Sequence, residues 1–372
     1  MSNLETKLNQ KSAMTALKRT LTTMLALALV GAAGGGCTKA ARSKRAVERA
    51  DHYYQAGDYG TAEVAYSNAC RMAYPPNPIA LRQLGLVYVK EGRPGAAFGL
   101  LQKAATNEPD NAEVQIELAS ILPMVGRMAD ARAAARSALK LLPGNERALV
   151  ALCEASRSAE DAGQTRHYIE QLQKQDQDRA SYHLALGLID ARETNLAAAE
   201  SELNKARSMD PKSSLVYVGL ARLSEIHNDL KGADQAYKTA VELAPLRSPV
   251  RLRYAEFQAQ TGATNQARQS MMELIRQAPD YLPPSLFLMR LAYGEGNYEE
   301  CKSCISQVLA HEPNNYDALL MRADVSMGKK DGKQAVADFE YLMALYPKDP
   351  RPQVPYQLAS AYLLSGNRAK AC

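Results

Sequence analysis

Small and apolar residues recur along most of the chain at a spacing that predicts paired helices. In one clear stretch, intervals of seven, five and seven residues separate Gly85, Gly92, Ala97 and Ala104. These intervals place small side chains on one face of each of two helices, with a tight turn at Gly92. The stretch ends at Pro109, since proline cannot continue a helix. The pattern therefore predicts a helix–turn–helix unit.

The unit recurs with a fixed period. The unit from 146 to 179 departs most from the pattern, with Cys153 in its first small slot and Gln177 where proline is expected. A tenth first helix, predicted from Tyr356 to Gly366, has no complete second helix after it. Prolines mark the period, at intervals of 34 residues or twice 34: Pro75, Pro109, Pro143, Pro211, Pro245, Pro279, Pro313 and Pro347.

A helix–turn–helix unit with this period resembles the tetratricopeptide repeat. The resemblance covers residues 46–372, about nine and a half repeats with the last one incomplete. It implies an all-α fold, a right-handed superhelical solenoid of antiparallel helix pairs. Because a solenoid grows by adding units, we expect one elongated domain. The tenth unit is apolar, so we expect the natural protein to continue past Cys372 or a partner to cover this end, and we favour the former.

The composition indicates which residues fill the core and which class of partner to expect. With 4 Phe and no Trp in 372 residues, alanine and leucine must fill most of the core. The formal charge is +5, and outside the first 36 residues it is 41 minus 39, or +2. A nucleic-acid-binding chain normally concentrates basic residues on one face. We therefore expect no nucleic-acid partner.

The N-terminal residues 1–37 predict an export signal. Lys18 and Arg19 precede an apolar run from Leu21 to Val30, which leads into GAAGGGC ending at Cys37. A charged region, a short apolar region and a small-residue cleavage site are typical of a secretory signal. The run is shorter than the roughly 20 residues that span a bilayer. Met14 is an alternative start that would shorten the charged region.

The small residues before Cys37 resemble the lipobox of bacterial lipoproteins. The resemblance implies that Cys37 is acylated and becomes the new N-terminus, although Gly34 stands where that family usually has an aliphatic residue. Thr38 follows, rather than the aspartate that favours inner-membrane retention in enterobacterial members. The resemblance therefore implies an outer-membrane lipoprotein facing the periplasm, and secretion to the periplasm by an ordinary signal is the alternative. The basic segment 38–45 is predicted to be a solvated tether.

The sequence offers no constellation for catalysis or metal binding. Cys301 and Cys304 form a CxxC pair inside a predicted helix, and Cys301 and Cys153 both fall in small slots, so we interpret them as small hydrophobic residues. A structural zinc site needs four ligands, and His311 is the single histidine nearby in sequence. We find no Gly-rich phosphate loop, nucleophile elbow or paired-histidine zinc helix. We predict no enzymatic activity, no cofactor and no metal.

A partner is expected on the first helix of each unit. In the tetratricopeptide family these helices line a concave groove, and the resemblance points to the slot three residues before the first small residue. That slot is apolar in seven of eight units, which fits either a hydrophobic ladder for a protein or peptide or a partly buried core position. Mixed charges one turn further along disfavour a polyanion. The slot holds Arg82, Ile116, Val150, Leu184, Val218, Leu252, Leu286 and Leu320.

Two functions from different classes fit these features. The first is a non-catalytic, lipid-anchored scaffold in the periplasm. It resembles lipoproteins with tetratricopeptide repeats that serve exopolysaccharide export, pilus secretin assembly or outer-membrane protein insertion, and most of all the exopolysaccharide group. The second is an accessory module of a larger enzyme whose catalytic domain lies beyond Cys372. Sequence beyond that residue would separate the two.

Overall fold

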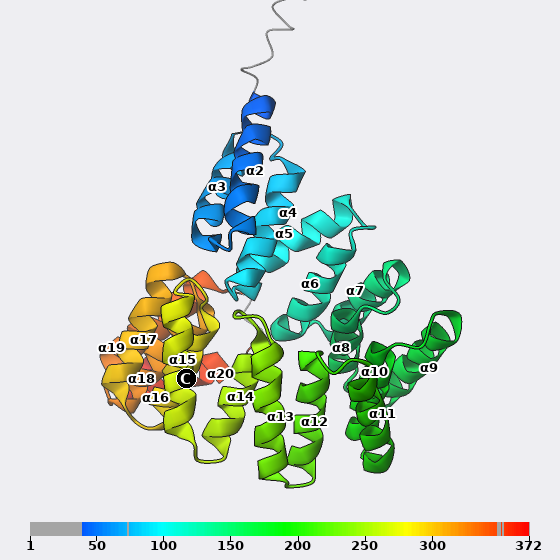
Figure 1. The fold of residues 1–372 in the computed structure, drawn as a ribbon. Coiled ribbons are helices and arrows are strands. Elements are labelled where there is room, and N and C mark those ends of the chain that lie inside the picture. Colours follow the sequence, from blue (N-terminus) through cyan, green and yellow to red (C-terminus); the bar gives the residue numbers. More distant parts are fainter. Residues whose placement is uncertain (1–38, 73, 348–350, 352, 372) are drawn as a thin grey trace, which may run out of the picture. The chain divides into compact units, whose positions relative to one another are not determined.

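The computed structural model describes residues 39–72, 74–347, 351 and 353–371 (Figure 1). All regular elements among them are helical, so the predicted all-α class is confirmed for this part of the chain. The chain divides into two compact units, Met1–Leu84 and Gly85–Cys372. The predicted signal and Cys37 lie outside the described residues.

The first unit is built on a helical hairpin of α2 (Lys39–Gln55) and α3 (Tyr59–Arg71). Ala46 and Ala50 of α2 and Ala62 of α3 are buried. The Ser43 hydroxyl donates a 2.9 Å hydrogen bond to the main-chain oxygen of Ala69. The predicted tether is therefore wrong from residue 39 onward, because these residues form the first turns of α2 and Ser43 is buried against α3.

The second unit begins within α4 (Pro78–Lys90) and continues as a series of helices joined by short turns. Its elements are α5 (Pro94–Asn107), α6 (Ala112–Ile121), the 3-10 helix η1 (Leu122–Val125), α7 (Met128–Leu141), α8 (Glu146–Ala155), α9 (Ala159–Gln175), α10 (Ala180–Arg192), α11 (Leu196–Met209), α12 (Ser214–Ile226), α13 (Leu230–Leu243), α14 (Pro249–Gln260), α15 (Thr264–Gln277), α16 (Pro283–Gly294), α17 (Tyr298–His311), α18 (Tyr316–Gly328), α19 (Gly332–Leu345), α20 (Gln353–Leu364) and α21 (Arg368–Ala371).

These helices pack in consecutive pairs, and the first helices also make contacts between neighbouring pairs. From α6 to α16, each first helix packs against its own second helix and also against the first helix of the next pair. Second helices of successive pairs do not pack together to a comparable extent in the described part of the chain. Figure 1 shows the pattern in α12 to α15, which stand side by side in chain order. The structure is thus an all-α solenoid of helix pairs, with the first helices stacked in one layer.

In the described pairs other than the fourth, the turn places a left-handed residue at the slot that Gly92 occupies in the second repeat. Glycines at this slot have φ between 71° and 88°, as at Gly92 and Gly262. In three pairs the slot holds Thr194, Asn228 or Lys330, with φ between 58° and 61°. Glycine adopts this conformation without steric cost, whereas a side chain with a Cβ does not. Repeat geometry therefore imposes the same backbone on residues that do not favour it.

The fourth repeat keeps its register without such a turn. Its first helix, α8, ends at Ala155, and arginine side chains bind the carbonyl groups left at that end. Arg192 donates a 2.5 Å hydrogen bond to the main-chain oxygen of Cys153 and a second to that of Ser156. Arg132 donates at 2.9 Å to the main-chain oxygen of Ala155. Cationic side chains satisfy these carbonyls and offset the negative end of the helix dipole.

Candidate functional site

The apolar residues predicted to bind a partner lie on the first helices, but their burial differs. Ile116 and Leu184 are buried, at 7% and 0% exposed, so these two are core residues and the prediction that they face a partner is wrong. The remaining members of the slot beyond Arg82 are half-buried and each packs against a cluster of core residues: Val150, Val218, Leu252, Leu286 and Leu320.

Leu184 is buried in a cluster with Leu203 of α11 and Val216 of α12, and side chains of α8 and α12 also contact each other near α10. The hydroxyl of Ser213, which caps α12, donates a hydrogen bond to the Glu146 carboxylate of α8. Arg222 of α12 also lies 3.8 Å from Glu154 of α8. Nine of the 13 residues of α10 are buried, because this helix packs against α8, α9, α11 and α12. A partner therefore has no access to the first helix of the fifth repeat at this slot.

Further along the chain the first helices remain accessible. Two side chains stand out here, because Arg290 is exposed and Tyr356 is 75% exposed. Half-buried leucines lie one turn before the charged positions on the same helices, so apolar and charged groups alternate. We call this surface the first-helix face, formed by Leu252 and Glu256 of α14, Leu286 and Arg290 of α16, Leu320 and Asp324 of α18, and Tyr356 and Ser360 of α20.

The carboxyl group of Asp324 is the most perturbed charge on the first-helix face. Burial raises the pKa of Asp324 to about 6, because a partly desolvated carboxylate is less stable in its ionised form. The Gln357 amide donates a 2.8 Å hydrogen bond to Asp324 Oδ1. A basic group from a partner would favour the ionised carboxylate. The first-helix face thus offers apolar contact, a cation at Arg290 and an acid at Asp324.

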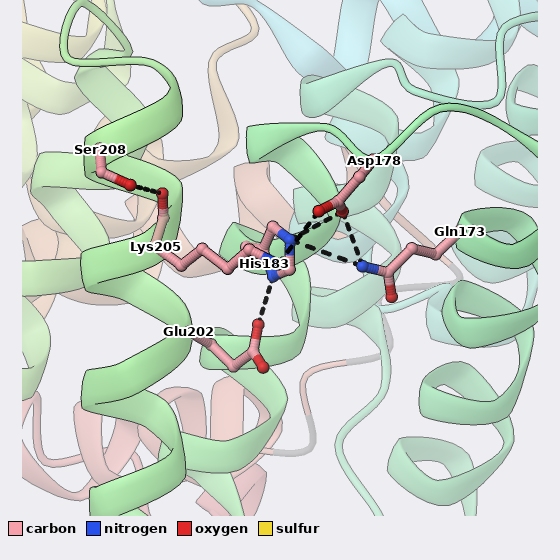
Figure 2. A network of polar contacts seen from close by, with 6 residues as sticks. All are labelled: Gln173, Asp178, His183, Glu202, Lys205 and Ser208. Atoms are coloured by element: carbon pink, nitrogen blue, oxygen red, sulfur yellow. Dashed lines mark hydrogen bonds and ion pairs between the residues drawn. The ribbon is translucent and has the colours of Figure 1, made fainter.

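His183 lies at the centre of a polar network that the sequence did not indicate (Figure 2). Its Nδ1 is 2.5 Å from Glu202 Oε2, and its Nε2 is 2.8 Å from Asp178 Oδ1. Hydrogen bonds from Gln173 and Lys205 lower the pKa of Asp178 to about 2. The His183 side chain is only 4% exposed. The network joins the segment before α10 to α10 and α11, which is a structural role.

Ser208 stands at the edge of the same network without touching the histidine. Its hydroxyl donates to the main-chain oxygen of Lys205 (Figure 2). A serine activated for catalysis would instead donate to a base such as His183. The sequence signal for this network was weak, because its residues are spread over α9, the loop between α9 and α10, α10 and α11.

The CxxC pair lies inside α17 and belongs to the core. Cys301 and Cys304 are buried among apolar residues of α15, α16 and α17. Burial raises the pKa of Cys301 to about 11 and that of Cys153 to about 12. Thiols with these pKa values stay protonated at neutral pH and are poor nucleophiles and metal ligands. The interpretation of these cysteines as small hydrophobic residues therefore agrees with their environment.

Two further features are absent from the described part of the chain. No three His, Cys, Asp or Glu side chains there are placed to hold a metal ion together. None of the helices described is both long and apolar enough to cross a membrane.

The tetratricopeptide repeat family model matches residues 47–112, 83–146 and 288–350. These stretches are therefore tetratricopeptide repeats, a type of repeat that binds protein or peptide partners and is typically non-catalytic. No curated protein matches the chain in sequence.

Solved structures of low sequence identity also match. Yeast Tom70 is 14% identical over 89% of this chain and 90% of its own, with a TM-score of 0.43. The APC/C hetero-tetramer Cut9–Hcn1 contains a chain 16% identical over 90% of this chain and 72% of that chain, with a TM-score of 0.46. Pseudomonas aeruginosa pilF is 20% identical over 60% of this chain and 100% of its own, with a TM-score of 0.39.

Proposed function

We propose that this protein is a non-catalytic scaffold that binds a protein partner on the first-helix face. The observation that carries the proposal is the alternation of half-buried leucines with Arg290 and Asp324 on consecutive first helices, ending at the exposed Tyr356. Buried apolar anchors with aromatic and arginine side chains are the residues that dominate protein–protein binding. The partner is a protein segment rather than a polyanion, because the face carries both signs of charge.

The partner segment is expected to be an amphipathic helix or an extended peptide. Leu286 and Leu320 expose only part of their side chains, so they offer shallow apolar contacts rather than deep pockets. A segment with apolar residues at regular intervals would cover these contacts from one helix to the next. An acidic residue opposite Arg290 and a basic residue opposite Asp324 would set its direction and register.

The scaffold is proposed to work in the bacterial cell envelope. Small residues that lead into Cys37 support acylation of this cysteine and attachment to the outer membrane from the periplasmic side. The finer proposal is that the scaffold serves assembly or export of an envelope component, namely an exopolysaccharide, a pilus or an outer-membrane protein complex.

Metabolic labelling tests the anchor. A clickable palmitate analogue should label the wild-type protein and not the Cys37→Ser variant, and the labelled protein should sediment with outer membranes. Equal labelling of the two proteins would remove the lipid anchor from the proposed function.

Co-purification from envelope extracts tests the first-helix face. The variant Arg290→Glu/Tyr356→Ala should lose the bound partner without a change in melting temperature, because both side chains are exposed. The control is Met272→Ala/Arg276→Glu, which makes changes of similar kind at exposed positions of α15, a second helix. Loss of the partner in both variants, or in neither, would count against this face as the binding surface.

A further inference from the structure

Helix α2 has one face built into the first unit and another that points outward. Ser43, Ala46, Val47 and Ala50 are buried. The exposed positions between them are mainly basic, and they hold Arg42, Lys44, Arg45 and Arg49.

The three arginines of α2 lie along one side of the helix. Positions 42, 45 and 49 are separated by three and four residues, so their guanidinium groups follow one side of the helix over about 10 Å. Glu48 is the exposed acid beside them. Asp51 instead accepts a 2.5 Å hydrogen bond from the hydroxyl of Tyr66, which lies on α3. The three arginines and Glu48 give this surface, which we call the arginine face, a formal charge of 3 minus 1, or +2.

One of these arginines lies at the start of the helix. The first turn of α2 holds Lys39 and Arg42 and no acidic residue. The N-terminal end of a helix carries partial positive charge, so basic residues there are unfavourable for the helix and favour an anion nearby.

We propose that the arginine face, Arg42, Arg45 and Arg49, binds the anionic phospholipid headgroups of the membrane that holds Cys37. Guanidinium groups donate paired hydrogen bonds to phosphate oxygens. Tyr53 and Met72 line the same surface depression as the three arginines. A tyrosine and an apolar side chain next to cations suit the boundary between headgroups and acyl chains.

The place of α2 in the sequence favours a lipid surface over other anionic partners. The helix begins at Lys39, two residues after Cys37. Two residues reach at most roughly 7 Å, which is less than the Debye length of about 8 Å at physiological salt. This step rests on the proposed function, in which Cys37 carries the lipid. An acylated Cys37 would hold the start of α2, and with it Arg42, close to the negative membrane surface.

Vesicle binding of the full chain tests the arginine face separately from the anchor. All proteins carry Cys37→Ser, so none is acylated, and all share the same residues 1–37. Binding is measured to phosphatidylcholine vesicles with and without phosphatidylglycerol. The further changes Arg42→Gln/Arg45→Gln/Arg49→Gln should weaken binding to the anionic vesicles on the order of 100-fold, because each basic residue contributes roughly fivefold. Binding to neutral vesicles should not change.

Two further variants separate the face from total charge and from folding. Arg207→Gln/Lys212→Gln/Lys231→Gln removes the same charge at exposed positions of the second unit and should keep anionic binding. Arg42→Lys/Arg45→Lys/Arg49→Lys keeps the charge and should retain most of the binding to anionic vesicles. Equal loss in the face variant and the charge control would overturn the proposal, as would tighter binding to soluble polyglutamate than to anionic vesicles.

The vesicle test and the labelling test can fail independently. None of the proteins in the vesicle test is acylated, so a negative result there does not bear on the palmitate labelling of Cys37. Absent labelling with preserved vesicle binding would instead remove the anchor and leave the arginine face in place.

Discussion

The main-chain N–H of Leu282 donates a 2.9 Å hydrogen bond to the main-chain oxygen of Glu91, joining two distant turns of the second unit. Leu282 precedes α16, and Glu91 follows α4. Both residues are buried, at 2% exposed. Beside them, Gly92 packs so closely on Pro283 that an added Cβ would lie 2.2 Å from Pro283 Cγ. This contact therefore requires glycine for its size as well as for its backbone conformation.

Substitution of Gly92 should cost more than substitution of a comparable turn glycine. Gly92→Ala meets both a positive φ and Pro283, so we expect a loss of about 2–4 kcal/mol in the free energy of unfolding. Gly262 has a φ of +88° and nothing within 4 Å of an added Cβ. Gly262→Ala should therefore lose about 1 kcal/mol from the backbone alone. Urea unfolding of the two variants measures the difference, and equal losses would mean that the contact between the turns contributes nothing.

Arg192 should be required for the stability of the fourth repeat. Arg192→Met leaves the carbonyl groups of Cys153 and Ser156 without their cationic donor, so we expect a loss of about 2 kcal/mol. Burial also lowers the pKa of Arg192, which shows that its guanidinium group is partly desolvated. The control Arg207→Met, at an exposed position of α11, should change stability by less than about 0.5 kcal/mol. Thermal unfolding of both variants tests this prediction. An Arg192→Met protein as stable as the wild type would contradict the capping role.

Replacement of Thr194 by glycine should stabilise the protein. The Thr194 φ of 61° is unfavourable for a β-branched residue, so Thr194→Gly should raise the free energy of unfolding by about 1 kcal/mol. The matched change Thr239→Gly lies inside α13, where glycine should lower stability by about 1 kcal/mol. Opposite shifts in the urea midpoint are expected. A loss in both variants would mean that the Thr194 side chain, rather than its backbone, matters.

Asp324 should make stability fall with rising pH. Its pKa is about 6 in the folded protein and about 3.9 in an unfolded chain, so between these values the folded state binds more protons. The free energy of unfolding therefore decreases as pH rises from about 4 to 6, through the ionisation of this buried carboxyl group. Asp324→Asn stays neutral and should gain stability relative to wild type over that window. A difference between the two proteins that is independent of pH would contradict the buried-carboxyl explanation.

The period of small residues and prolines was enough to predict the helix pairs. It placed Ala119 and Ala131 in close-packed positions, and both are completely buried. The turn predicted at Gly92 falls, by the same period, at residue 228 of the sixth repeat, where the structure has Asn228 with a φ of 58°. These features are local to one repeat, so they repeat in the sequence.

Features that depend on contacts between repeats could not be predicted in this way. Leu184 occupies the same slot as Leu286, yet it is buried in a cluster with Leu203 of α11 and Val216 of α12. The basic segment that ends at Arg45 resembles a tether until the partner of its buried face, α3, is known. The partly exposed positions of the first-helix face likewise depend on how much each neighbouring helix covers.

Site-specific photo-crosslinking in living cells tests the central claim most directly. A photo-reactive residue is placed singly at positions 290 and 356 on the first-helix face, and at positions 272 and 276 of α15 as controls. The scaffold account predicts that positions 290 and 356 give the same discrete protein adduct in the cell envelope and that the controls give none. Adducts from the α15 positions alone, or equal adducts from all four, would contradict it.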